Sequence, residues 1–542
     1  MKRLPSRRSA FLGSLAAVAV VACAMAAYGA ASVTGGSAKK AASETLVVDR
    51  SFEIKTSDPQ RAFEPTAAIV DRGVYDTLFT YRGGDLAHPI PLLVSKWVAN
   101  KNATTFTFQL KRNVHFADGT PLTAADVVFS LRRLINLKGN PAFLLAGVTP
   151  SLGGRYTVVL RSKTPNAAIP AILANTSTGV VNARLVRAHG GTDGPAAAKT
   201  DKAEKWLNSA DSAGAGSGPY LLKQYSTTSQ ITLVPNTRYW GAPKPTFGTV
   251  VIRNMIAPTQ LINIQRGKHE VAIDLSSDQA QTIKGNKNLR VALSPSTWIF
   301  FMLANDNPQI SSVTSNKKWQ EAVRYALDYK SIVGVGGPGS IQAPGVIPSM
   351  FLGALPQKDA IKQDVARAKA ALQASGVGGE KVTLEYPSDL TINGVPFATL
   401  AQKVQANLQS VGFNIDLAGS PVGTWLQKYR DGKMAFGLSL WGDDYPDPAD
   451  YLVFTPGQLV GLRAGWPKGS DPTIEKLAAT ALVATAEGPR ERVYQAIQRE
   501  LNKRGPFYPL MQPTQVFVST NDLRNAVFNA QYQIDVTKVS PK

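Results

Sequence analysis

Three aspartates follow an apolar, alternating run near the C-terminal end of the chain. The run ends at Leu440, and the sequence continues Trp441-Gly442-Asp443-Asp444-Tyr445-Pro446-Asp447-Pro448. This pattern predicts a buried strand followed by acidic and aromatic residues at the entrance of a cleft, where one carboxylate binds a cation of the ligand. Because successive side chains of a strand point to opposite faces, only one of Asp443 and Asp444 should face such a cleft. The alternative is a solvated turn, since Asp and Pro commonly form turns.

Two glycine-rich stretches have partial patterns of cofactor or catalytic sites. Residues 334–339 follow a helical pattern rather than a strand, and Pro338 would interrupt a helix there, so a flexible loop is expected instead of a dinucleotide site. The serine among glycines at 214–218 lacks the spacing of a nucleophile elbow, because Pro219 stands where glycine is needed. Neither stretch predicts an enzyme.

The four histidines, His88, His115, His189 and His269, lie far apart in sequence and include no i,i+4 pair. No histidine metal site is therefore predicted, and we expect each to be a surface or packed residue. The sequence also offers no recognisable set of nucleophile, base and orienting residue. It predicts a protein that is not an enzyme and carries no metal or cofactor.

The composition is that of a folded protein with several domains. The chain has 542 residues, of which 44% are hydrophobic and 18% charged, and this length exceeds the size at which one core keeps growing. The formal net charge is +21, but the basic residues are spread along the chain without a dense run. We interpret the charge as a solvated surface attracted to an anionic envelope, and we expect no nucleic-acid binding.

The N-terminal segment has the layout of a secretory leader. Four basic residues within residues 2–8 precede an apolar run at 11–22, and Val20-Val21-Ala22-Cys23 resembles a bacterial lipobox, in which the leader is cut before a cysteine that is acylated. The apolar residues continue to Ala31, so a cut near Ala31 and an uncleaved anchor stay open as alternatives. Each alternative exports the chain, with residues 33–43 as a flexible tether.

Hydrophobic periodicity in the second half predicts an α/β unit. Alternation marks strands at 382–386, 413–417 and 434–440, and helical spacing marks residues 397–411 and 425–429 between them. This β-α-β-α-β order predicts a lobe with its ligand site beyond the strand ends. In the first third, strands at 105–110 and 114–119 precede a helix that Thr123 and Asp126 cap.

Four motifs occur in a fixed order along the chain. The first spans Lys96 to Leu134 and contains Asp118-Gly119-Thr120-Pro121-Leu122-Thr123, and the later three are Gly216-Ser217-Gly218-Pro219-Tyr220 with residues 236–241, residues 320–328, and Pro506-Phe507-Tyr508-Pro509-Leu510. In this order they resemble the signature segments of extracellular solute-binding protein family 5, the dipeptide- and oligopeptide-binding components of bacterial ABC importers. The resemblance runs from about Thr45 to the C-terminus.

The resemblance implies a two-lobed α/β fold of the class II periplasmic-binding-protein type, with an extra small domain and a hinge of two crossings. Domain I would combine residues 44–75, 205–297 and 515–542. Domain II would be a small α+β insertion at 76–204, and domain III an α/β lobe at 298–514. Residues 1–43 would hold the export signal and tether.

The resemblance also implies a ligand site between the lobes. It places Asp444 on the ammonium group of a peptide and Asp443 on the other face. Leu440, Trp441 and Gly442 would lie along the ligand backbone, with Trp441 lining a side-chain pocket.

The loop Phe63-Glu64-Pro65 would form the opposite wall, although Pro65 cannot donate a hydrogen bond. Residues 386–389 lack the arginine that clamps the ligand carboxylate in dipeptide binders. A longer peptide or a cationic non-peptide ligand therefore fits better than a fixed dipeptide.

As a whole, the resemblance implies an exported substrate-binding protein that is lipid-anchored at Cys23 on the periplasmic or outer face of the cytoplasmic membrane. It would act as a monomer and deliver peptides to an ABC permease. Nickel chelates, haem, opines, glutathione and oligosaccharides are alternative ligands within the same family. An envelope hydrolase and a sensory binding protein are alternatives from other classes.

Overall fold

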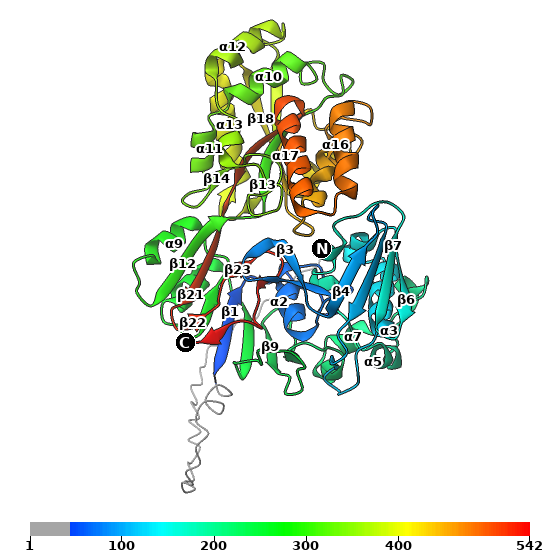
Figure 1. Cartoon of the computed structure of the whole chain (residues 1–542). Coiled ribbons are helices and arrows are strands. Elements are labelled where there is room, and N and C mark those ends of the chain that lie inside the picture. Colours follow the sequence, from blue (N-terminus) through cyan, green and yellow to red (C-terminus); the bar gives the residue numbers. More distant parts are fainter. Residues whose placement is uncertain (1–43) are drawn as a thin grey trace, which may run out of the picture.

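The computed structural model describes residues 44–542, so the predicted leader and the lipidation site at Cys23 lie outside the described part. Three larger sheets organise the described residues (Figure 1). A six-stranded sheet and its helices form one lobe, drawn uppermost. A seven-stranded and a four-stranded sheet lie side by side beneath it.

The seven-stranded sheet takes its strands from three separated parts of the sequence. Its central strand β1 pairs in parallel with β10 and with β11. Across the sheet the order is β12 (Leu289–Pro295), β21 (Thr514–Thr520), β11 (Glu270–Ala272), β1 (Thr45–Arg50), β10 (Thr249–Asn254), β9 (Gln230–Pro235) and β8 (Tyr220–Gln224). Helix α2 (Pro65–Val74) packs on β8 and β9 and begins with Pro65, which suits the first turn because no hydrogen bond is required there.

The four-stranded sheet is antiparallel and packs against α3 (Ala124–Leu137). Its order is β4 (Val94–Ala99), β5 (Thr105–Leu110), β7 (Thr157–Ser162) and β6 (Val148–Gly154). The predicted cap of α3 is confirmed, because the Thr123 amide donates to Asp126 Oδ2 at 2.9 Å and both halves of the capping box are present.

The strand predicted at 114–119 is wrong. His115 and Pro121 form only an isolated bridge. The chain reverses at Asp118-Gly119, with Gly119 at φ +88°, and Pro121 has no amide hydrogen with which to extend a ladder. The segment is therefore a tight loop.

The six-stranded sheet contains the β-α-β-α-β unit predicted from periodicity. The order across the sheet is β14 (Ile341–Gln342), β20 (Phe507–Gln512), β13 (Ile299–Ala304), β19 (Phe436–Trp441), β15 (Lys381–Pro387) and β18 (Asn414–Ser420). The helices of this lobe include α10 (Lys317–Ala326), α12 (Val365–Ala374), α13 (Phe397–Val411), α14 (Val422–Arg430), α16 (Pro472–Val483) and α17 (Glu487–Arg504). Strand β15 runs parallel to both β18 and β19, so the carboxyl ends of these three strands share one edge.

The chain passes between the two large sheets at two places. Residues 296–298 connect β12 to β13, and Pro513 connects β20 to β21. The amide of Ser296 donates to the carbonyl oxygen of Pro513 at 2.8 Å, so the two crossings lie side by side. Within residues 44–542, none of the helices combines the length and apolar character that a membrane crossing requires.

Candidate functional site

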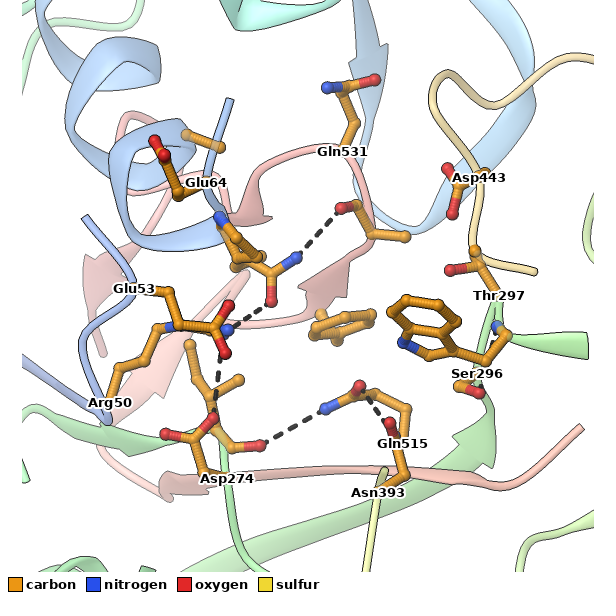
Figure 2. Close-up of a pocket in the computed structure, with 18 of the residues that line it drawn as sticks. Arg50, Glu53, Glu64, Asp274, Ser296, Thr297, Asn393, Asp443, Gln515 and Gln531 are labelled. Carbon is orange, nitrogen blue, oxygen red and sulfur yellow. Dashed lines mark hydrogen bonds and ion pairs between the residues drawn. The ribbon is translucent and has the colours of Figure 1, made fainter. Parts of the chain in front are cut away.

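A cavity of about 650 Å³ lies where the two large sheets meet (Figure 2). Residues from both lobes line it. The upper lobe contributes residues 442–444 after β19, the lower lobe contributes residues 62–65 before and at the start of α2, and the crossing at 296–298 lies between them. Its volume is in the range of small-molecule and peptide sites, which are usually concave and built between lobes.

Most of the residues predicted to bind a ligand line this cavity. Gly442 and Asp444 come from one side, and Phe63, Glu64 and Pro65 from the other.

Leu440 and Trp441 are not among the lining residues. Both pack partly buried against the apolar core, and the Trp441 indole donates to Asp450 Oδ2 at 3.3 Å. Their place along a ligand backbone stays a prediction.

Asp443 and Asp444 both line the cavity, so the expectation that only one of them faces a cleft is wrong. Alternation applies only while a strand continues, and β19 ends at Trp441, two residues before Asp443. In the loop that follows, adjacent side chains are free to turn to the same side.

The two half-buried carboxylates hold negative charge without a cationic partner. Burial raises the pKa of Asp443 to about 6, and burial followed by the charge of Asp443 raises the pKa of Asp444 to about 6. Behind them, buried Asp450 accepts the Asp444 amide at 3.1 Å. Its own pKa is raised well above the ordinary value, first by burial and then by the charge of Asp444. Within residues 44–542, no lysine or arginine forms an ion pair with any of the three.

Asp447 has a structural role in the same loop. Its Oδ1 accepts from Arg490 of α17 at 2.7 Å and from the Ala449 amide at 2.9 Å, which caps the short helix η5 (Pro448–Phe454). Both partners of the ion pair are buried. The pair fixes the loop that carries Asp443 and Asp444.

The opposite wall carries Arg50, Glu53, Glu64 and Asp274, and Figure 2 shows these four side chains across the cavity from Asp443. The Arg50 guanidinium donates to Gln533 Oε1 at 2.7 Å and lies 3.8 Å from Asp274 Oδ1. Arg50 is the one basic side chain among the described lining residues, and protein groups already pair with it.

Sequence reasoning missed Arg50, Glu53 and Asp274. The order of the strands could have indicated Arg50 and Asp274. Arg50 ends β1, and Asp274 follows the parallel strand β11 by two residues. Ligands usually bind at the carboxyl ends of parallel strands. That indication depends on pairing between residues more than 200 positions apart.

The lobes also touch away from the crossings. The Asn175 side chain donates to the carbonyl oxygen of Asp444 at 3.3 Å. On the surface, His88 Nε2 of β3 (Asp85–Pro91) lies 3.4 Å from Glu487 Oε1 of α17. The two contacts join the upper lobe to the lower part of the molecule at points other than the crossings.

Side chains that bind metal ions are not clustered within residues 44–542. No group of three or more His, Cys, Asp or Glu residues there is placed to hold a metal ion, and none of the four histidines lines the cavity. The charged groups that do line it suit binding through ion pairs and hydrogen bonds.

The chain is similar to known proteins over nearly its whole length. A model of bacterial extracellular solute-binding proteins, family 5 Middle, matches residues 88–458. The probable D,D-dipeptide-binding periplasmic protein DdpA of Escherichia coli (strain K12) is 25% identical over 504 residues, which is 90% of this chain and 92% of the relative.

Two solved structures show the same fold. HbpA2 from Haemophilus parasuis superposes with a TM-score of 0.79 at 19% identity, covering 92% of this chain and 100% of that one. The binding protein DppA from Helicobacter pylori, solved with the peptide STSA, gives a TM-score of 0.70 at 19% identity, covering 93% and 99%. The two-lobed α/β fold expected from the sequence is confirmed.

Proposed function

The chain belongs to the bacterial extracellular solute-binding proteins of family 5, and on this basis we propose that it captures peptides between its lobes and delivers them to the permease of an ABC importer. It acts as an exported binding protein and not as an enzyme. Closure of the lobes on a ligand gives the permease a state that it distinguishes from the empty protein.

The observation that carries this proposal is the acidic pair Asp443 and Asp444 in a cavity walled by both lobes. A half-buried carboxylate without a partner is costly, and a cation from the ligand relieves that cost. A peptide supplies this cation as its N-terminal ammonium group. The amide side chains around the cavity, such as Asn175 and Gln531, offer donors and acceptors for the peptide backbone.

We assign the ammonium contact to Asp444, with Gly442, Phe63, Glu64 and Pro65 forming the walls around it. Asp443, on the same side of the cavity, is the alternative partner. Within residues 44–542 no lysine or arginine pairs with either carboxylate, so the loss of the one that binds the ammonium group should weaken peptide binding by about 3–5 kcal/mol.

The domain division inferred from the sequence has support in the sheets. The strands of the four-stranded sheet lie within 76–204 and those of the six-stranded sheet within 298–514. Those of the seven-stranded sheet, apart from Thr514 at the start of β21, lie within 44–75, 205–297 and 515–542. In this proposal the crossings at 296–298 and Pro513 form the hinge, and the monomer is the working unit.

We place the protein in the cell envelope, held by an acylated Cys23. The lipobox-like sequence supports this, while a cut near Ala31 and a retained anchor are the alternatives. Metabolic labelling with a fatty-acid analogue should mark the wild-type protein and leave the Cys23→Ser variant unmarked. A labelled variant, or an unlabelled wild type, would remove the lipid anchor.

The proposal is tested by native mass spectrometry of gently purified protein, followed by calorimetry. We expect peptides to copurify, and we expect Asp444→Asn to weaken their binding while Asp416→Asn, an exposed change outside the cavity, leaves it intact. A larger loss in Asp443→Asn would move the ammonium contact to Asp443. Turnover of the bound peptide by the purified protein would support a hydrolase and defeat the transport proposal.

A further inference from the structure

A second cavity of about 490 Å³ adjoins the first at the crossing between the lobes. The two cavities share Thr297, Phe528 and Ala530 as lining residues, so they meet along these three side chains. Ser349 and Met350 of the upper lobe also line the second cavity, and its remaining walls come from the lower part of the molecule. Both lobes therefore contribute to it, as they do to the first cavity.

Strand β12 presents small side chains to the second cavity. Ala292 and Ser294 line it, whereas the alternate residues Val291 and Leu293 pack against an apolar cluster on the other face of the sheet. Directly across the ladder from Ala292 is Phe517 of β21, which also lines the cavity. The small residues leave space, and the aromatic ring gives that space an apolar wall.

The rest of the lining is largely apolar. It includes Val527, which is 40% exposed. The other apolar residues are Leu86, Pro295, Met350, Ala526, Phe528 and Ala530. An apolar side chain of a ligand would bind here favourably, because its surface and that of the lining would leave water together.

One charged side chain, that of Arg290, lines the second cavity among the described residues. Its guanidinium donates to Ser519 Oγ at 3.1 Å and to the carbonyl oxygen of Ala526. Both acceptors are neutral, and within residues 44–542 no carboxylate forms an ion pair with Arg290. The remaining N–H groups of the guanidinium are available to an anionic group of a ligand.

The two cavities are opposite in charge. The first contains Asp443 and Asp444, and its one basic side chain among the described residues, Arg50, already lies 3.8 Å from Asp274. The second contains Arg290. A peptide has an ammonium group at one end and a carboxylate at the other, so its charges match an arrangement across both cavities.

We propose that the second cavity binds the C-terminal residue of a peptide whose N-terminal ammonium group lies at Asp443 and Asp444. An apolar side chain of that residue packs between β12 and Phe517, and its carboxylate pairs with Arg290. This inference rests on the proposed function and specifies its substrate class, which is a peptide of several residues with an apolar C-terminal side chain.

The length of β12 sets a lower limit on the length of this peptide. Arg290 and Pro295 are five residues apart on the strand, a distance of about 16 Å. An extended chain spans at most about 3.6 Å per residue, so about five residues are needed to cover that distance alone. A tripeptide would therefore occupy the first cavity without reaching Arg290.

The test uses calorimetry on the purified binding protein with heptapeptides of alanine and serine. One ends in leucine and a second in alanine, and a third is the C-terminal amide of the leucine peptide. We expect leucine to bind about tenfold more tightly than alanine at the last position, because it buries more apolar surface. The amide should bind about two- to fivefold more weakly than the free carboxylate, since Arg290 is exposed and solvent screens the pair.

Two variants assign these effects to the second cavity. Ala292→Phe fills the space and should remove the preference for leucine, while trialanine keeps its affinity within about twofold. Arg290→Gln should remove the difference between carboxylate and amide, and Arg290→Lys should restore part of it.

The control variants lie outside both cavities. Thr383→Phe adds an aromatic ring at an exposed strand position, and Arg524→Gln removes an exposed arginine from the same part of the molecule as Arg290. Both should keep the two preferences. Circular dichroism and melting temperature verify that each variant is folded.

A crosslink locates the C-terminal residue directly. The heptapeptide with p-benzoylphenylalanine at its last position should, after irradiation, form adducts with residues of the second cavity such as Met350 or Val527. Adducts on residues of the first cavity alone would overturn the proposal.

The other outcomes separate this inference from the proposed function. Equal binding of the leucine and alanine peptides, or a leucine preference that survives in Ala292→Phe, would overturn the second cavity as a subsite and leave peptide binding intact. A carboxylate preference that survives in Arg290→Gln would overturn the pairing with Arg290. No binding by trialanine or by any heptapeptide would overturn the proposed function itself.

Discussion

The backbone amide of Ser296 donates a hydrogen bond of 2.8 Å to the carbonyl oxygen of Pro513, which joins the two segments that cross between the lobes. Gln512 reinforces this bond from within the upper lobe. Its side-chain amide donates to the Ser296 carbonyl oxygen at 2.7 Å and accepts from the Ser349 amide at 3.0 Å. We expect the lobes to turn about this joined pair, since a few residues between rigid elements absorb such motions.

The first prediction concerns Gln512, which is fully buried. Gln512→Ala leaves the Ser296 carbonyl and the Ser349 amide without partners, so the free energy of unfolding should fall by about 1–3 kcal/mol. Urea denaturation measures this change. Gln309→Ala, at an exposed glutamine, is the matched control and should change stability by less than about 0.5 kcal/mol. Equal effects of the two substitutions would show that the crossings do not depend on Gln512.

The second prediction concerns the buried ion pair between Arg490 and Asp447. Arg490→Met leaves the Asp447 carboxylate buried and unpaired, which should cost about 3–5 kcal/mol of stability. Because this pair fixes the loop of Asp443 and Asp444, peptide affinity should fall as well.

Arg499 of the same helix α17 provides the control. Its partner Asp359 lies 2.9 Å away, but half of the Arg499 side chain is exposed, so Arg499→Met should cost less than about 1 kcal/mol. Thermal and urea unfolding of both variants measure the two losses of stability. Similar losses in the two variants would mean that burial does not strengthen the ion pair of Arg490 with Asp447.

Local sequence pattern predicted the upper lobe well. The helix predicted at 397–411 coincides with α13, and the strand predicted at 434–440 falls on β19 (Phe436–Trp441). Such elements are decided by side-chain periodicity and caps, which are short-range properties. The strand predicted at 114–119 was wrong for a long-range reason. An alternating segment becomes a strand only when another segment of the chain forms a ladder of hydrogen bonds with it.

The candidate site was predictable only in part. The strand end at Trp441 and the acidic residues beyond it are visible in the sequence, but the side on which Asp443 lies depends on where β19 stops. The opposite wall brings together Glu53 and Asp274, which no local pattern connects. Their proximity follows from the parallel pairing of β1 with β11.

The third prediction concerns pH. The pKa values of Asp443 and Asp444 are raised to about 6, from an unfolded value of about 3.9, so between about pH 4 and pH 6 the folded state binds more protons than the unfolded state. The contribution of this pair to stability is therefore greatest at low pH, and it is lost as pH rises through this window. Binding of a cationic peptide has the opposite dependence, since it needs the ionised carboxylates and should weaken below about pH 6.

The variant Asp443→Asn with Asp444→Asn removes both carboxylates, and with them their effect on the pKa of Asp450. The difference in melting temperature between wild type and variant, measured without peptide from pH 4 to pH 8, should shift against the wild type as pH rises. Calorimetry at pH 5 and pH 7.5 should show weaker peptide binding by the wild type at the lower pH. A difference in melting temperature that is independent of pH would contradict the raised pKa values.

The last prediction decides the role of Trp441. Its indole donates to Asp450 at 3.3 Å and its ring meets Phe454 edge to face at 6.1 Å between centroids, so the side chain supports the floor beneath the acidic pair. Trp441→Phe keeps the aromatic packing and removes the donor, which should lower stability by about 1 kcal/mol, the usual net value of one hydrogen bond. Since Trp441 does not line the cavity, peptide affinity should stay within about twofold of the wild type. A loss of tenfold or about 1.4 kcal/mol in affinity, with stability unchanged, would instead place Trp441 on the ligand. That result would also mean that the lobes rearrange around the peptide when it binds, because the ring would have to reach a cavity that it does not line in this structure.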